Sequence, residues 1–193
     1  MKVCEPEEVP APRRSDRTRA AILDAARRRF AAHGFERTTI RAVAADAGID
    51  PSMVMRYFGS KARLFDAALD IDLNLPDLSA TPADELAETV VRHFLRRWEH
   101  DGADDALLLL LRSAVTNGRA AQRMREIFAG QVAPSLGEAH AEKAGLISTQ
   151  LLGLALTRQM LRIPGVARMT SEEVVAAYAP AIRSMLQSPP AAA

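Results

Sequence analysis

The sequence predicts an all-α protein of about nine helices, with an N-terminal three-helix unit built around a helix-turn-helix and a larger C-terminal helical bundle. Three observations support this fold class. Apolar residues recur three and four positions apart along most of the 193 residues, alanine and leucine are abundant, and no alternating β-branched run exceeds a few positions. Glycine and proline divide this pattern into segments of ordinary helix length.

The first helix is expected from about residue 16 to residue 33. Ser15 is a suitable N-cap, one face carries an apolar stripe, and Gly34 stands where a left-handed residue commonly ends a helix. Residues 1–14 are interpreted as a disordered tail, acidic and proline-rich at first and basic at its end. Because Cys4 is the only cysteine, no internal disulfide and no cysteine-based metal site is expected.

The second and third helices are predicted to be short and joined by a tight turn. The second follows the N-cap Thr39, and the third follows Asp50 with Pro51 at its first position and ends near Phe58. An isolated helix of about seven residues is unstable in water, so the third must be held by packing against the second. The residues expected to shape the turn or fill the crossing are Val43, Ala44, Gly48, Ile49 and Val54.

Longer helices separated by helix breakers are predicted for the rest of the chain. A fourth helix begins near Ser60 and ends at or before Pro76, and residues 74–82 form a linker. A capping box from Thr170 to Glu173 opens the last helix. The remaining helices are expected at about 81–100, 104–117, 119–137, 141–162 and 171–187. The expected domains are residues 15–62 and 63–188, flanked by tails at 1–14 and 189–193.

The formal net charge of +1 hides an uneven distribution. Residues 13–63 carry twelve basic and five acidic side chains, a net +7, whereas residues 64–193 carry twelve and sixteen, a net −4. Such a basic block is typical of a domain that binds a polyanion such as DNA. The alternative is a basic surface that is only solvated, because it would have the same composition. The longest strictly apolar run, residues 106–111, is far below the roughly 18 residues of a membrane span, so no membrane partner is expected.

Residues 18–69, TRAAILDAARRRFAAHGFERTTIRAVAADAGIDPSMVMRYFGSKARLFDAAL, resemble the DNA-binding domain of the tetracycline-repressor (TetR) family of bacterial transcriptional regulators. The resemblance rests on the apolar stripe of the first helix and on the motifs His33-Gly34-Phe35, Thr38-Thr39-Ile40, Ala47-Gly48-Ile49, Tyr57-Phe58 and Ser60-Lys61. It implies that the short third helix enters a major groove about 12 Å wide and presents side chains to base edges.

Candidate DNA contacts follow from the chemistry of the basic unit. Arginines near the start of the first helix can reach phosphates, and free backbone N–H groups at the start of the second helix favour a phosphate. Arg56 is suited to a guanine edge or to a phosphate, and Thr39 is suited to a phosphate or to a cap alone. The predicted set is Arg17, Arg19, Thr38, Thr39, Arg41, Pro51, Ser52, Met53, Met55, Arg56, Tyr57 and Lys61.

One position of the predicted third helix departs from the family pattern. Met55 stands where the family usually carries a tyrosine, and a thioether cannot donate a hydrogen bond to a phosphate. Three interpretations remain open: the contact is lost, it has moved to Arg56 or Tyr57, or Met55 only packs.

The C-terminal part is expected to form a homodimer, since DNA half-sites related by two-fold symmetry call for a two-fold symmetric protein. LLGLAL at residues 151–156 is apolar on every side, and with the last helix it could form a four-helix interface, as the resemblance implies; packing within one chain is the alternative. The residues predicted for this interface are Ile147, Leu151, Leu154, Val174, Tyr178, Ile182 and Met185.

The resemblance also implies a small-molecule pocket among the middle helices. Phe94, Trp98, Met124 and Phe128 are its candidate lining, and each could instead be ordinary core. Low aromatic content and leucine-rich helices favour an apolar or amphipathic ligand. No catalytic residue, metal site or cofactor is predicted, because the four histidines are scattered and no phosphate loop or nucleophile motif occurs.

The sequence therefore predicts a cytoplasmic, homodimeric DNA-binding regulator with no enzyme activity, which binds a palindromic operator and is released by a small molecule. A repressor is favoured because occupying an operator blocks polymerase without further machinery. An activator or ligand-independent regulator is the alternative within the family. A helical small-molecule carrier or interaction protein without operator specificity is the alternative from another class.

Overall fold

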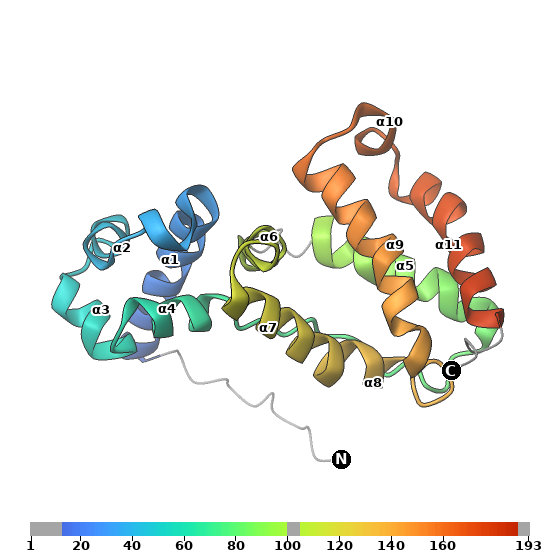
Figure 1. Cartoon of the computed structure of the whole chain (residues 1–193), viewed down its shortest axis with the longest axis horizontal. Helices are drawn as coiled ribbons and strands as arrows, with labels where there is room; N and C mark the ends of the chain where they lie inside the picture. Colours follow the sequence, from blue (N-terminus) through green and yellow to red (C-terminus); the bar gives the residue numbers. More distant parts are fainter. Residues whose placement is uncertain (1–12, 100–104, 189–193) are drawn as a thin grey trace, which may run out of the picture. The chain divides into compact units, whose positions relative to one another are not determined.

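The computed structural model describes residues 13–99 and 105–188 (Figure 1). These residues form helices joined by turns, with no strand in the described ranges, and nine of the helices are eight or more residues long. The all-α prediction is confirmed. The chain divides after Ala68 into two compact units, each of which is described by itself.

The first unit contains α1 (Arg14–Arg37), α2 (Ile40–Ala47), α3 (Pro51–Phe58) and α4 (Lys61–Ala68). The boundary predicted after residue 62 therefore falls inside a helix of the first unit. The predicted tails at 1–12 and 189–193 lie outside the described residues, whereas Arg14 is already helical.

The expected cap at Ser15 is wrong by two positions. Arg13 occupies the cap position, and its carbonyl accepts the amides of Asp16 and Arg17 at 2.9 and 3.2 Å. Ser15 lies within the first turn, where its hydroxyl points to the Asp16 carboxylate at 3.4 Å instead of capping the helix. Gly34 does interrupt the helix, because its φ of 73° and ψ of 173° are not helical.

An aromatic cluster holds α1 against α4. The rings of Phe30 and Phe65 meet edge to face, with centroids 4.9 Å apart, and Phe35 lies 5.0 Å from Phe65. Phe30 and Phe65 are buried, as is Leu64 beside them on α4. Such ring pairs add about 0.5–1.5 kcal/mol to the stabilisation from burial alone, so this cluster is the main apolar anchor of the unit.

The second unit opens with an extended segment that runs beside α7 and α8 (Figure 1). Helix α4 ends at Ala68, eight residues before Pro76, and side chains from α5 and η1 bind the backbone of the following residues 71–73. The elements that follow are α5 (Ala83–Glu99), α6 (Asp105–Ala114), α7 (Gly118–Ile127), η1 (Phe128–Val132), α8 (Ala133–Ser135), η2 (Ala141–Lys143), α9 (Ala144–Ala155), η3 (Leu156–Met160), α10 (Pro164–Ala167) and α11 (Ser171–Gln187).

These elements agree with the predicted helices in position but not in regularity. The helix predicted at 119–137 widens into the π-helical turn η1, and the helix predicted at 141–162 begins with the 3₁₀ turn η2 and ends in the π-helical turn η3. The short α10 was not predicted. The predicted break at 100–105 lies almost entirely outside the described residues.

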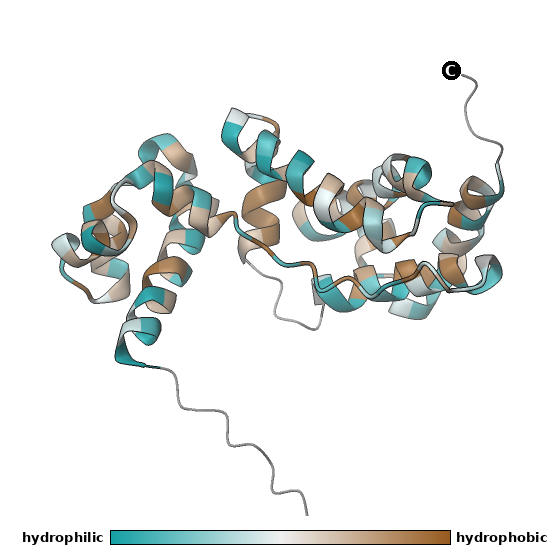
Figure 2. Cartoon of the chain, turned by 90° about the horizontal axis from the view of Figure 1, so that it is seen from below, coloured by the Kyte–Doolittle hydropathy of each residue, from teal (hydrophilic) through white to brown (hydrophobic). Residues whose placement is uncertain are grey.

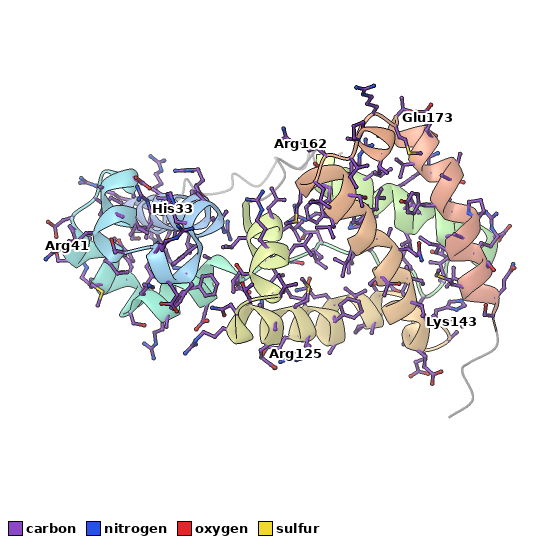
Figure 3. All side chains as sticks on the ribbon, turned by 45° about the horizontal axis from the view of Figure 1, so that its top comes forward. His33, Arg41, Arg125, Lys143, Arg162 and Glu173 are labelled. Carbon is purple, nitrogen blue, oxygen red and sulfur yellow. The ribbon has the colours of Figure 1, made fainter. Side chains whose placement is uncertain are left out.

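A shared core of buried apolar residues joins α5, α9 and α11. Hydrophobic and hydrophilic residues alternate around the helices of the chain (Figure 2). The start of α11 is fixed by the predicted capping box, in which Thr170 accepts from the Glu173 amide and Glu173 accepts from the Thr170 amide. Glu173 is labelled in Figure 3. Arg92 of α5 binds Glu172 of α11 through two hydrogen bonds of 2.7 and 2.9 Å. The core residues of these helices include Leu86, Val91, Leu95, Ile147, Leu154, Val174 and Ile182.

We expect the Gly48→Ala substitution to destabilise the protein by about 1–2 kcal/mol, because φ at this turn is +64° and an L side chain is strained there. No atom lies within 4 Å of the added Cβ, so the cost is conformational rather than steric. Gly48→Asn is the matched control, because asparagine tolerates this conformation better. Urea unfolding of both variants checks the prediction, and equal losses for the two would contradict it.

Candidate nucleic-acid interface

The helix-turn-helix of the first unit is formed by α2, the turn at Gly48 and α3. Thr39 caps α2 by accepting the Ala42 amide at 3.2 Å, and Gly48 takes the left-handed conformation that the turn requires. Val43, Ala44 and Val54 are buried at the crossing, as predicted from the sequence, whereas Ile49 is half-buried. The outer side of α3 is thereby turned to solvent.

The N-terminus of α3 is capped by the side chain of Asp50, the residue that precedes the helix. Asp50 accepts the Ser52 amide at 2.8 Å and the Ser52 hydroxyl at 2.5 Å. These bonds, the hydroxyl bond above all, lower the pKa of the Asp50 carboxyl. Ser52 was predicted to contact bases, yet its hydroxyl proton is already donated, so toward DNA this hydroxyl can only accept. The Asp-Pro-Ser sequence at a helix start is the signal for this arrangement.

An ion pair fixes the angle between α1 and α2. Arg29 donates from Nε and Nη2 to the two carboxylate oxygens of Asp46 at 2.5 and 2.7 Å. This pairing lowers the pKa of Asp46 chiefly through the hydrogen bond. Nearby, Arg27 donates from Nε to the Ala68 carbonyl at 3.2 Å. The sequence does not reveal these pairs, because their partners become neighbours only after the helices pack.

Most of the predicted DNA contacts are on the surface of the first unit. Arg41 projects outward from α2 (Figure 3). On α3, Met55 is 44% exposed, and the Arg56 guanidinium lies 5.7 Å from the centroid of the Tyr57 ring. Pro51, Met53 and Tyr57 are half-buried. The exposed members of the predicted set are Arg17, Arg19, Thr39, Arg41, Ser52, Met55 and Arg56.

Two predicted contacts are already engaged inside the unit. Thr38 is buried, and its hydroxyl donates to the Gly34 carbonyl at 2.8 Å, so this side chain fixes the end of α1. Lys61 is half-buried, donates to the Glu36 carbonyl at 3.1 Å and lies 4.4 Å from the centroid of the Phe35 ring. The position of the Lys61 side chain is therefore set by the unit itself.

The four residues proposed as pocket lining come together in the second unit. Phe94, Trp98, Met124 and Phe128 line one cavity of about 140 Å³, with Phe94 and Trp98 ring centroids 5.9 Å apart. The rest of the wall is mostly leucine, isoleucine and valine. Its polar side chains are His93, Arg97, Ser135 and Ser148.

The residues predicted for a subunit interface do not all reach the surface. Four of them are buried within the single chain and cannot contact a second copy: Ile147, Leu154, Val174 and Ile182. The other three, Leu151, Tyr178 and Met185, are half-buried. Exposed residues form another stripe on each helix at three- and four-residue spacing. These are Gly145, Leu146, Thr149, Gly153 and Leu156 on α9 and η3, and Ala176, Ala177, Pro180, Ala181 and Ser184 on α11.

Within residues 13–99 and 105–188, no cluster of three or more histidine, cysteine, aspartate or glutamate residues could hold a metal ion. No helix in these ranges has the length and apolar character needed to cross a membrane.

Residues 22–68 match the family model described as bacterial regulatory proteins, tetR family, and residues 84–186 match the one described as tetracyclin repressor-like, C-terminal domain. A helix-turn-helix transcriptional repressor of Mycobacterium tuberculosis is 40% identical over 77 residues, which are 38% of this chain and only 41% of that repressor.

Two solved structures are similar over nearly the whole chain. A TetR-family regulator of Streptomyces coelicolor is 29% identical with a TM-score of 0.61, covering 93% of this chain and 100% of that one. The multidrug binding protein EbrR, solved with imidazole, is 25% identical with a TM-score of 0.65, covering 98% of this chain and 100% of that one.

We expect the Arg29–Asp46 pair to stabilise the first unit in a pH-dependent way. Because the folded pKa of Asp46 lies below the unfolded value of about 3.9, the contribution is present above that value and is lost as pH falls through the folded pKa. Asp46→Asn should therefore lower the free energy of unfolding relative to the wild-type protein at pH 6, and this difference should shrink as the pH approaches 3. Urea unfolding between pH 7 and pH 3 measures this, with the exposed Glu138→Gln as control, and a pH-independent difference would refute it.

Proposed function

The chain belongs to the tetracycline-repressor family of bacterial regulatory proteins, and from this premise we propose that it is a homodimeric repressor released from its operator by a small apolar or amphipathic molecule. The family and its repressor relative make it a DNA-binding regulator of transcription. The observation that carries the proposal is the solvent-facing side of α3, with Arg56 and Met55 exposed on a helix whose inner face is buried.

Arg56 is the residue we assign to base recognition. A guanidinium can bind the O6 and N7 atoms of guanine through two hydrogen bonds, and the Tyr57 ring at 5.7 Å supports the guanidinium from within the helix. Arg17, Arg19 and Arg41 are exposed and suit phosphate contacts, which orient a protein on DNA without reading sequence. Met55 at the same surface suits apolar contact with a thymine methyl group.

A second copy of the chain is proposed to pack on the exposed stripes of α9 and α11. Both stripes consist mainly of small or apolar side chains, so two helix pairs can approach closely. The two helices share one core and therefore form one surface. This assignment replaces the buried residues predicted from the sequence, and two-fold pairing would present two α3 helices to a palindrome.

The cavity among α5, α6, α7 and α9 is the proposed effector site. It is walled mainly by apolar side chains, and a cavity of about this size can hold a benzene-sized group. Support also comes from EbrR, which is described as a multidrug binding protein. We propose no catalytic activity.

Operator binding tests the proposal against a carrier that lacks sequence specificity. Fluorescence anisotropy would compare the DNA flanking the protein's own coding region with scrambled DNA at near-physiological salt. A regulator should bind one palindromic site at two chains per site and prefer it by about a thousandfold or more. Equal, salt-sensitive binding to all fragments, persisting in a selection from random genomic DNA, would favour the carrier.

We expect Arg56→Ala to weaken operator binding by about 5- to 150-fold, which corresponds to about 1–3 kcal/mol for one base contact. Base preference should relax at one position in each half-site. Binding measured on a set of operators with single base changes checks this, with Arg168→Ala, an exposed arginine of the second unit, as control. Uniform weakening on every sequence would instead assign Arg56 to a phosphate.

We expect Leu146→Asp to convert the dimer to a monomer, because this side chain is 55% exposed on the α9 stripe and a charge there would be buried by the partner. Val115→Asp is the matched control, since Val115 is 84% exposed outside the stripe. Light scattering after size-exclusion chromatography gives the mass of each variant. A dimeric Leu146→Asp protein would rule out this surface.

A further inference from the structure

One polar side chain in the wall of the cavity has no partner within the described residues. The polar side chains of the wall are His93, Arg97, Ser135 and Ser148. His93 and Arg97 contact the backbone carbonyls of residues 73 and 72 and have further interactions as well. The Ser135 hydroxyl donates to the carbonyl three residues before it at 2.8 Å. Ser148 of α9 is therefore the polar group of this wall that requires an explanation.

The Ser148 side chain is buried among apolar neighbours. It is 7% exposed, and the other buried residues of α9 are alanine, isoleucine and leucine. Across residues 13–99 and 105–188, no side chain or backbone group forms a hydrogen bond with its hydroxyl. A buried hydroxyl that lacks a partner costs free energy, because it has given up its bonds to bulk water. Since Ser148 lines the cavity, a molecule inside the cavity can supply the missing bond.

Two neighbouring hydroxyls show how a helix ordinarily satisfies such a group. Thr149 donates to the carbonyl three residues before it at 2.6 Å, and Thr157 donates to the carbonyl four residues before it at 2.8 Å. These bonds within the helix need no other molecule. Ser148 makes no such bond within the described residues, and packing does not require its oxygen, since Ala144 is buried one turn earlier without one. The hydroxyl is thus left for a molecule in the cavity.

The rest of the wall limits which molecules suit Ser148. It consists mainly of leucine, isoleucine and valine around a space of about 140 Å³, which can hold a benzene-sized group. An ionised ligand would have to displace existing partners of His93 or Arg97, or remain unpaired at a high cost. A neutral oxygen displaces nothing, because a hydroxyl can donate to or accept from Ser148 and a carbonyl can accept from it.

We propose that the effector is an uncharged, mainly apolar molecule with a hydroxyl or carbonyl oxygen, and that this oxygen forms a hydrogen bond with Ser148. The inference rests on the proposed function and specifies the chemical class of its ligand. Apolar contacts hold a molecule of suitable size, and the hydrogen bond selects the oxygenated one, because an analogue without the oxygen leaves the buried hydroxyl unpaired. Water is the alternative partner of this hydroxyl, and the test distinguishes the two.

Calorimetric titration of the full-length protein with phenol and with toluene tests this class. The two molecules share a benzene ring and differ in a hydroxyl or a methyl group of similar size, and phenol is uncharged at neutral pH because its pKa is about 10. Toluene is the more hydrophobic, so each ligand is compared between the wild-type protein and Ser148→Ala. We expect the substitution to weaken phenol binding about 3- to 10-fold and to leave toluene binding unchanged or tighter.

A proportional change in both affinities, or no change in either, would assign the hydroxyl to water and overturn the proposal. An absence of saturable phenol binding to the wild-type protein would overturn it as well. Ser188→Ala is the matched control, because it removes the hydroxyl of an exposed serine at the end of α11, outside the cavity. This control should change neither affinity.

The stability of ligand-free Ser148→Ala separates a ligand-binding role from a structural one. Alanine removes an unpaired polar group, so we expect the variant to unfold at a urea concentration equal to or above that of the wild-type protein. A clearly lower midpoint would show that the hydroxyl stabilises the fold through a bond inside the chain, and would overturn the proposal. None of these measurements uses DNA, so a failure of operator binding would count against the proposed function alone, and a failure here would leave operator binding intact.

Discussion

The burial of Val54 and Phe58 on the inner face of α3 is the interaction on which the candidate DNA interface depends. A helix of eight residues does not persist in water by its own hydrogen bonds. Packing of this face, a cap at Asp50 and a turn at Gly59 therefore determine whether the outward side chains have fixed positions at all. The aromatic cluster around Phe65 lies beneath these contacts. It holds α1 against α4, and the short helices α2 and α3 pack on this pair. Recognition chemistry at the surface is thus set by apolar contacts beneath it.

Features determined by neighbours within about four residues could be predicted from the sequence. The caps at Thr39, Asp50 and Thr170 and the turn at Gly48 belong to this class, because each requires a particular side chain or backbone freedom at one position. The cap at Ser15 failed because the helix begins two residues earlier, and local signals place helix ends only to within a residue or two. The family resemblance implied a cavity among the middle helices, and Phe94, Trp98, Met124 and Phe128, chosen as its candidate lining, do line one cavity.

Features determined by residues far apart in the chain could not be predicted. Ile147 and Val174 are apolar on helices expected at an interface, but only the packing of α5, α9 and α11 around one core shows that they are internal. Thr38 is a residue type that can bind a phosphate, but it is buried and its hydroxyl donates to the Gly34 carbonyl. The extended backbone at residues 71 and 73 is bound by the amide of Gln131, about sixty residues later in the chain. Periodicity carries no information about such partners.

The π-helical turn η1 has a consequence for how related chains can differ. A π turn holds one residue more than an α turn, so a single residue can be gained or lost there while the helix on either side keeps its course. Gln131 lies within this turn and supplies two hydrogen bonds to the backbone of residues 71 and 73. A relative shorter by one residue at η1 can therefore retain the cavity wall and yet lack these two bonds. The cavity wall and the anchoring of this extended segment would then vary independently among related chains, through a change of length instead of a change of side chain.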